Sequence, residues 1–218
     1  MDKKEILSKT EEFVKKKLLN FDVAHDWWHT QRVWKNTLLL LREEKGVDSF
    51  VCQLGALLHD VGDPKFYKGG EKEGGEIIKK FLQSIELPEE IIGEVLSIVR
   101  HVSFSQSFDK PSYFSPELAV VQDADRLDAM GAIGIARAFS YGGFKNQAIY
   151  DPEQPFMPST KKEEYIHKRT STVNHFYDKL LRLKEMMNTP TGKKIAEERH
   201  AFMLHYLAQF HAEGKGEK

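Results

Sequence analysis

The sequence predicts an all-α fold, a compact bundle of several helices. Apolar residues recur at spacings of three and four along one segment after another, the pattern of amphipathic helices. Asp, Pro and Gly residues, which favour helix starts and stops, separate these segments. The sequence contains no internal repeat and no convincing pair of strands. It also lacks a Pro/Gly/Ser-rich linker, so we expect one domain over residues 1–218.

Composition limits the class of protein. With 40% hydrophobic residues, a chain of 218 residues can bury a sizeable core. Its 32 Lys and Arg balance 33 Asp and Glu, so no overall basic field favours a nucleic-acid polymer and phosphate binding must be local. The single Cys52 excludes an intramolecular disulfide. The start lacks the apolar core of a signal peptide, and no apolar run reaches membrane-spanning length. We expect a cytoplasmic protein without a membrane partner.

The first two helices are predicted from amphipathic spacing. Residues 3–19 place apolar side chains among lysines and glutamates, and we expect their charged face to be solvated and without chemistry. A second helix is expected to begin after Asp26, which can cap it, and to run to about Lys45, before a glycine.

The stretch from Leu54 to Phe66 sets a histidine and an aspartate side by side at the end of an apolar segment. Its leucines and Val61 recur at helical spacing, so we expect a core helix that stops at the following Gly and Pro. His59 and Asp60 then fall in its last turn. An ionised carboxylate beside a buried face is costly unless a cation compensates it, and a divalent metal would do so. A surface or capping pair is the ordinary alternative.

Two further helices are expected before residue 102. The glycines between Gly69 and Gly75 predict a loop leading into a helix that ends near Pro88, and this loop lacks the GKS or GKT ending of a P-loop. Pro88 and two glutamates begin another helix, which ends with Arg100 and His101. These two side chains either complement the helix dipole or face the site, where they would contact phosphate. His101 would then be the candidate ligand of a second metal.

Residues 103–116 are polar, aromatic and broken by two prolines, so we expect a loop that lines or covers the site. A helix is expected to begin at the second proline and to continue through GAIGIARAFSY, because its small residues permit close packing. This helix carries Asp123, Asp125 and Asp128.

The last third of the chain is expected to contain a loop and two helices. The loop, over residues 141–160, holds aromatic and amide side chains and Lys145, which suit a nucleoside and a phosphate as well as ordinary surface packing. Amphipathic helices are expected over 161–187 and 191–211. Five histidines of this region do not belong to a motif that pairs a histidine with a carboxylate. We expect them to be structural: His167, His175, His200, His205 and His211.

Three separated segments therefore carry metal-ligand side chains on apolar faces. His29 shares a helix face with Val33 and Thr37 through i, i+4 spacing, which points it toward the core. A histidine on such a face is more often a core residue, but the later His-Asp pair favours a ligand. His25 and Asp26, just before it, are expected to orient it, since metal-bound imidazoles usually donate their other N–H to an acceptor.

These phrases resemble the HD-domain phosphohydrolase superfamily, whose pattern is a histidine, a His-Asp pair and a later aspartate that together hold a divalent metal. The matching phrases are HDWWHTQRV, ALLHDVGD and DADRLD, and the resemblance spans roughly residues 24–130. It implies an HD-domain bundle with its core at about residues 24–140 and C-terminal helices at 161–211.

By position, the resemblance implies a set of four metal ligands: His29, His59, Asp60 and Asp125. Asp125 is preferred because ADRL matches the alanine-aspartate phrase of the family. Asp128 is expected to support the site, or else to form a salt bridge with Arg126 or a neighbouring helix. Two imidazoles and two carboxylates suit Mn²⁺, Ni²⁺, Co²⁺, Fe²⁺, Zn²⁺ or Mg²⁺ with open positions for water and substrate. The lack of thiolate ligands argues against a structural zinc.

The resemblance implies hydrolysis of a small phosphorylated substrate, most like a nucleotide, and we expect no nucleic-acid polymer as a partner. Relatives with similar phrases resemble nucleoside- or deoxynucleoside-triphosphate pyrophosphohydrolases, which release a monophosphate and pyrophosphate. Three alternatives remain: a cyclic-nucleotide phosphodiesterase, a dinuclear oxygenase on the same fold, and a non-catalytic nucleotide sensor. The sequence also leaves oligomerisation open.

Five further residues are candidates for the chemistry. Asp63 matches an acidic position that family hydrolases use to activate or orient water, although an aspartate before Pro64 can also simply form a turn. Lys65, Arg32 and Arg100 are the cations expected around the phosphates, and His101 is expected beside them.

Overall fold

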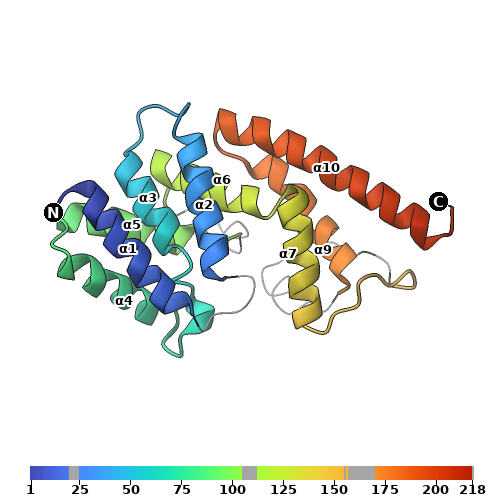
Figure 1. The fold of residues 1–218 in the computed structure, drawn as a ribbon, viewed down its shortest axis with the longest axis horizontal. Helices are drawn as coiled ribbons and strands as arrows, with labels where there is room; N and C mark the ends of the chain where they lie inside the picture. Colours follow the sequence, from blue (N-terminus) through green and yellow to red (C-terminus); the bar gives the residue numbers. More distant parts are fainter. Residues whose placement is uncertain (20–24, 105–111, 155, 157–169, 218) are drawn as a thin grey trace. The chain divides into compact units, whose positions relative to one another are not determined.

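The computed structural model of the protein describes residues 1–19, 25–104, 112–154, 156 and 170–217, and every regular element in these ranges is helical (Figure 1). The prediction of an all-α fold is confirmed. The α-helices are α1 (Lys3–Leu18), α2 (Trp27–Leu40), α3 (Ser49–Leu58), α4 (Gly70–Ser84), α5 (Glu89–His101), α6 (Pro116–Asp128), α7 (Gly131–Phe144), α9 (Thr172–Asp178) and α10 (Pro190–Gly214). Two 3-10 helices accompany them, η1 (Pro64–Phe66) and η3 (Leu180–Met186).

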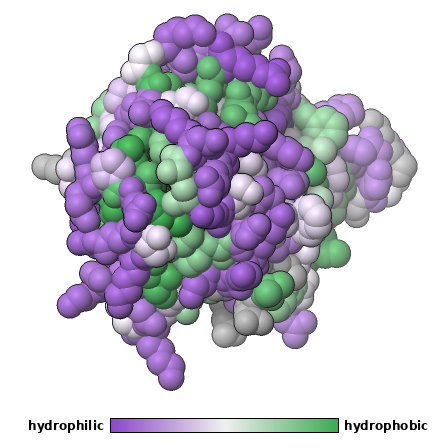
Figure 2. Space-filling model, turned by 60° about the vertical axis from the view of Figure 1, so that its left-hand side comes forward, coloured by the Kyte–Doolittle hydropathy of each residue, from purple (hydrophilic) through white to green (hydrophobic). Residues whose placement is uncertain are grey.

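The chain divides into two compact units, Met1–Asp125 and Arg126–Lys218. The single domain expected from the sequence stays a prediction. Within the described residues, no helix is both long and apolar enough to cross a lipid bilayer. Hydrophilic residues cover most of the face shown in Figure 2, with smaller hydrophobic areas between them.

Helix α3 is the centre of the first unit. It packs against α1, α2 and α5, and α4 in turn packs against α5. Leu54, Leu57 and Leu58 of α3 are completely buried, as their helical spacing predicts. The buried thiol of Cys52 lies on the same helix, and burial, reinforced by Glu117 and Asp48, raises its pKa to about 12. The end of α3 is therefore fixed from several sides, and the His-Asp pair follows it directly.

Helix α6 is anchored to the first unit by polar contacts. The Glu117 carboxylate accepts a hydrogen bond from the backbone N–H of Asp48, at 2.8 Å. The Gln122 side chain donates to the carbonyl oxygen of His101 at 2.9 Å, and Asn36 of α2 donates to the carbonyl oxygen of Ala124 at 3.1 Å. These contacts hold the segment before Asp125 beside α2 and α5.

In the second unit, α7 packs against α9 and α10, and η3 packs against both α9 and α10. The buried Phe176 and the half-buried Phe139, Tyr206 and Phe210 form an aromatic cluster in which contacting ring centroids lie 5.9 to 6.3 Å apart. This packing is the ordinary role of an amphipathic helix face.

The glycine-rich segment expected to be a loop is helical, and that prediction was wrong. Gly70, Gly74 and Gly75 lie in α4, and Glu71 and Glu73 in its first turn complement the helix dipole. A Cβ atom on Gly74 would lie 2.8 Å from the carbonyl oxygen of Gly62, in the turn after Asp60. Gly74 therefore allows the backbone of α4 to lie close to the backbone at Gly62. Composition alone does not distinguish a helical glycine of this kind from a glycine in a loop.

The long helix expected from the second proline of the 103–116 segment is two helices. The chain turns after Asp128, where Gly131 has a φ of 68°, a left-handed conformation that favours glycine. Gly142, expected in a loop, lies inside α7, where a Cβ atom would lie 2.1 Å from Thr172 Oγ1.

Helix α2 also ends earlier than about Lys45, because hydrogen bonds of i to i−3 type close its last turn.

The helix expected over 161–187 differs too. Its first part lies outside the described residues, and from residue 170 onward it consists of α9 and η3, which meet at Lys179. The helix expected over 191–211 is confirmed as the longer α10, which begins at Pro190 after a cap by Thr189. The loops expected over 103–116 and 141–160 are described only in part, because residues 105–111, 155 and 157–169 lie outside the described residues. His167 lies outside them as well.

Candidate metal centre

His29 is placed by the start of α2. The Asp26 carboxylate caps this helix and accepts a hydrogen bond from the backbone N–H of His29, at 2.8 Å. The His29 side chain is only 2% exposed, and Val33 and Thr37 on the same face are buried. The predicted orientation of His29 toward the core is therefore observed, whereas Asp26 contacts the backbone of His29 as a helix cap.

His59 is fixed by the end of α3, where it is the C-cap residue. Its Nδ1 lies 2.8 Å from the carbonyl oxygen of Ala56, which can only accept, so Nδ1–H donates. The other ring nitrogen, Nε2, then faces Nε2 of His29 at 3.3 Å. This tautomer leaves the His59 Nε2 lone pair available to a metal.

Asp60 follows His59 and is 6% exposed. Its Oδ1 lies 3.3 Å from Nε2 of His59, and its Oδ2 lies 3.5 Å from Nε2 of His29. Oδ2 is buried and forms no hydrogen bond within the described part of the chain. Burial raises the pKa of Asp60, and the neighbouring imidazoles of His59 and His29 lower it, with a net downward shift. The carboxylate is thus ionised, buried and in need of a cation.

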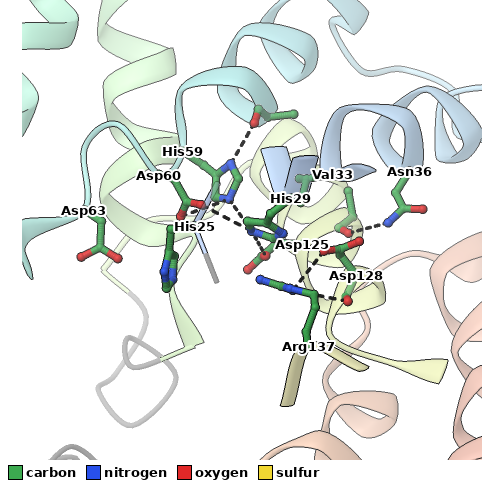
Figure 3. A network of polar contacts seen from close by, with 12 residues as sticks. His25, His29, Val33, Asn36, His59, Asp60, Asp63, Asp125, Asp128 and Arg137 are labelled. Carbon is green, nitrogen blue, oxygen red and sulfur yellow. Dashed lines mark hydrogen bonds and ion pairs between the residues drawn. The ribbon is translucent and has the colours of Figure 1, made fainter. Parts of the chain in front are cut away.

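Asp125 brings the fourth donor, from α6. Its Oδ1 lies 3.5 Å from Nε2 of His29, and its side chain is 29% exposed. The donor atoms of His29, His59 and Asp125 all lie within 4.8 Å of one another. Figure 3 shows these three residues and Asp60 converging from α2, the end of α3 and α6.

The spacing of these atoms suits one metal ion. Ligands bound at about 2.1 Å, at angles of about 90–110°, lie about 3.0–3.4 Å apart. Nε2 of His59 lies 3.3 Å from Nε2 of His29 and 3.3 Å from Oδ1 of Asp60, and Nε2 of His29 lies 3.5 Å from Oδ2 of Asp60 and 3.5 Å from Oδ1 of Asp125. These distances are close to that range. One cation could contact the two facing imidazole nitrogens together with Oδ2 of Asp60, which has no hydrogen-bond donor among the described residues. The residues present therefore fit a divalent metal.

A second donor group contains Asp60, which also contacts His29 of the first group at 3.5 Å. Donor atoms of His25, Asp60 and Asp63 also lie within 4.8 Å of one another. The Lys65 ammonium lies 2.5 Å from Nε2 of His25 and 3.0 Å from Oδ2 of Asp63. The sequence predicted that His25 orients His29 and did not predict its contact with Lys65. The two residues are 40 positions apart, so no local pattern indicates such a contact.

Asp63 forms the turn that its position before Pro64 favours. It caps η1, and its Oδ1 accepts a hydrogen bond from the backbone N–H of Lys65 at 3.0 Å. The structural expectation for this aspartate is therefore confirmed, and its role in activating water stays a prediction.

The remaining predicted cations lie in different settings. Arg32 is half-buried on α2. Arg100 is exposed, and its Nε lies 2.5 Å from Oε1 of Glu71 on α4. His101 donates from Nδ1 to the carbonyl oxygen of Ser97 at 2.8 Å, and its Nε2 lies 3.0 Å from the Ser112 hydroxyl. Both ring nitrogens of His101 are thus engaged within its own neighbourhood.

The other two aspartates of α6 differ from Asp125. Asp123 is completely buried. Asp128, in the second unit, forms an ion pair with Arg137 of α7, Oδ2 to Nη1 at 3.0 Å. A salt bridge with a neighbouring helix was one of the two expectations for Asp128.

Comparison with known proteins decides the family. The HD domain matches residues 27–130, a range that contains all four converging donors. An HD-superfamily hydrolase from Bacillus thuringiensis is 39% identical in sequence, with a TM-score of 0.77 over 98% of this chain and 99% of the other. The chain belongs to the HD-domain family.

Two other solved structures are similar over nearly the whole chain. A protein from Lactobacillus plantarum has a TM-score of 0.84 at 35% identity, and the match covers 96% of this chain and 97% of that one. YpgQ of Bacillus subtilis, solved in complex with ADP, has a TM-score of 0.77 at 33% identity over 98% and 97% of the two chains. The similarity of this protein to hydrolases of the HD superfamily therefore extends over both units.

Proposed function

We propose that this protein is a metal-dependent phosphohydrolase that cleaves a phosphoanhydride bond of a nucleotide. The observation that carries the proposal is the convergence of His29, His59, Asp60 and Asp125, with a buried, ionised carboxylate that needs a cation. Family membership supports hydrolysis as the reaction.

The four donors would hold one divalent ion, of which manganese is a candidate. When bound, such an ion lowers the pKa of a coordinated water and polarises a phosphoryl oxygen. The Ala56 carbonyl fixes the ring of His59, and the Asp26 cap fixes the start of the helix that carries His29. Both donors are therefore held in place before the ion arrives, which limits the reorganisation that binding requires.

Asp63 and two cations would act on the substrate. Asp63 follows the metal-bearing turn and would orient the attacking water or accept its proton. Lys65 and Arg32 would neutralise charge on the phosphates, and Lys65 contacts His25 and Asp63 of the second donor group. Arg100 and His101 are weaker candidates, because Glu71 and Ser97 already engage them.

A nucleoside or deoxynucleoside triphosphate is the substrate we favour. Water would add to the α-phosphorus and the bond to the bridging oxygen of the β-phosphate would break, releasing a monophosphate and pyrophosphate. The complex of the related YpgQ with ADP supports a nucleotide as ligand. A dinuclear oxygenase is less favoured, since His101, the expected second-metal ligand, has both ring nitrogens engaged elsewhere.

The test is a release assay for phosphate and pyrophosphate over a panel of nucleotides with each of the six candidate metals. We expect turnover of triphosphates that stops on chelation and returns with metal. His59→Ala is expected to lose metal and activity together, whereas the control His205→Ala, on the exposed side of α10, retains both. Full turnover by the metal-free His59→Ala protein would contradict the proposal.

The same panel separates the alternatives. Cleavage of cyclic nucleotides in place of triphosphates would indicate a phosphodiesterase, and oxygen uptake would indicate an oxygenase. Nucleotide binding without turnover under every metal would indicate a sensor.

A further inference from the structure

The ammonium of Lys65 occupies a position suited to a cation. It lies 2.5 Å from Nε2 of His25 and 3.0 Å from Oδ2 of Asp63, and above the ring of Phe66 at 4.7 Å from its centroid. An ammonium has only donors, so Nε2 of His25 accepts from it. Two different elements, the residues before α2 and the turn after α3, thus hold the same charged group.

The groups around this ammonium are themselves a set of metal-type donors. His25, Asp60 and Asp63 offer one imidazole and two carboxylates, with donor atoms all within 4.8 Å of one another. Asp60 belongs to this set and also lies 3.5 Å from His29 in the first donor group. Its Oδ2 is buried and accepts no hydrogen bond within the described ranges. A carboxylate shared in this way is the arrangement in which two adjacent cations are bridged.

We infer that the Lys65 ammonium takes the place of a second metal ion, so that the centre binds a single divalent ion beside a fixed organic cation. The inference rests on the proposed function, because it assumes an ion held by His29, His59, Asp60 and Asp125. It decides between one metal and two, and it gives His25 the role of a positioning residue for Lys65.

Charge balance favours this arrangement. The two donor groups contain three carboxylates, Asp60, Asp63 and Asp125, which carry three negative charges when ionised. One divalent ion and one ammonium supply three positive charges. A second divalent ion beside the ammonium would leave an excess of two positive charges at short range, which is unfavourable even in a partly solvated site.

The arrangement also predicts what happens when the ammonium is removed. Lys65→Met keeps most of the length of the side chain and removes the ammonium from its contacts with His25 and Asp63. The ammonium would then no longer compete with a metal for the three donors of the second group, and Asp60 would be the bridge. The variant is expected to gain a metal ion where most substitutions near a metal site lose one.

The experiment measures bound Mn²⁺ per chain by equilibrium dialysis and metal analysis, on the purified full chain after chelation and reloading with Mn²⁺ alone. Electron paramagnetic resonance of the same samples distinguishes an isolated ion from a magnetically coupled pair. We expect one isolated ion in the wild-type protein and a coupled pair in Lys65→Met. Lys68→Met, at an exposed lysine three residues later, should bind one ion, and so should the double variant His25→Ala/Lys65→Met.

The outcomes separate this inference from the proposed function. A coupled pair in the wild-type protein would overturn the inference and leave the hydrolase proposal standing. One isolated ion in a folded Lys65→Met protein, checked by circular dichroism, would also overturn it. No bound ion in the wild-type protein would overturn the metal centre itself, and with it both proposals.

Discussion

Among single residues, Asp60 combines burial with ionisation. Its position after an apolar helix indicates a carboxylate that is costly to bury. The structure places it between two imidazoles, and in the described part of the chain its Oδ2 has no hydrogen-bond donor. Such a residue destabilises a fold unless a cation accompanies it, and removing one partner of a buried charged group is strongly destabilising. The same side chain therefore links stability of the first unit to metal binding.

Asp63 allows the chemistry to be tested apart from metal binding. Asp63→Asn retains a side-chain oxygen that can accept from the backbone N–H of Lys65, so the η1 turn should persist. We expect the variant to keep its metal and to hydrolyse nucleotide roughly a hundredfold more slowly, as loss of a general base typically does. Metal analysis and steady-state rates measure the two properties separately. An unchanged rate would remove Asp63 from the mechanism.

At the scale of helices, the cap of α2 connects a local sequence signal to the metal centre. Asp26→Ala removes the acceptor of the His29 N–H and is expected to cost about 1 kcal/mol of unfolding free energy. It should also weaken Mn²⁺ binding, because it frees the first turn that carries His29. Urea unfolding and metal titration measure the two effects.

Helix α1 supplies the control for that variant. Asp2 caps α1 and accepts from the backbone N–H of Glu5 at 2.7 Å, far from any of the donors in sequence. Asp2→Ala should lose a similar stability and leave Mn²⁺ affinity unchanged. Equal loss of metal affinity in both variants would show that the cap of α2 has no specific role at the centre.

A pair of glycines in α4 tests the packing of the metal-bearing turn. Gly74→Ala would place a Cβ atom 2.8 Å from the carbonyl oxygen of Gly62, so it should destabilise the protein and disturb the turn that follows Asp60. Gly75→Ala meets nothing within 4 Å and should stabilise α4 by up to about 1 kcal/mol. Thermal unfolding of the two variants gives the comparison, and a neutral Gly74→Ala would refute the close approach.

These elements show what could be predicted from sequence. The cap at Asp26, the core face of α3 and the start of α5 near Pro88 depend on local spacing and were predicted correctly. The helical position of Gly74 and the turn at Gly131 were not predicted. Gly74 allows the backbone at Gly62 to approach α4 closely, and Gly131 adopts a left-handed conformation. Neither cause can be recognised from local spacing. The contact of Lys65 with His25 is likewise a tertiary contact without a local signature.

For the molecule as a whole, the central feature is that the first unit brings together donors from α2, the end of α3 and α6. Their order along the chain could be predicted from the family pattern, whereas their distances required the folded arrangement of these helices. Because the donors are distant in sequence, the unfolded chain cannot present them together, and bound metal is expected to stabilise the folded protein.

The most direct test of this account is the anomalous difference density of a crystal soaked in Mn²⁺. The account predicts a peak within bonding distance of His29, His59, Asp60 and Asp125, with no second peak between His25 and Asp63. Density that places the ion elsewhere, or four side chains that point apart with nothing bound between them, would contradict it.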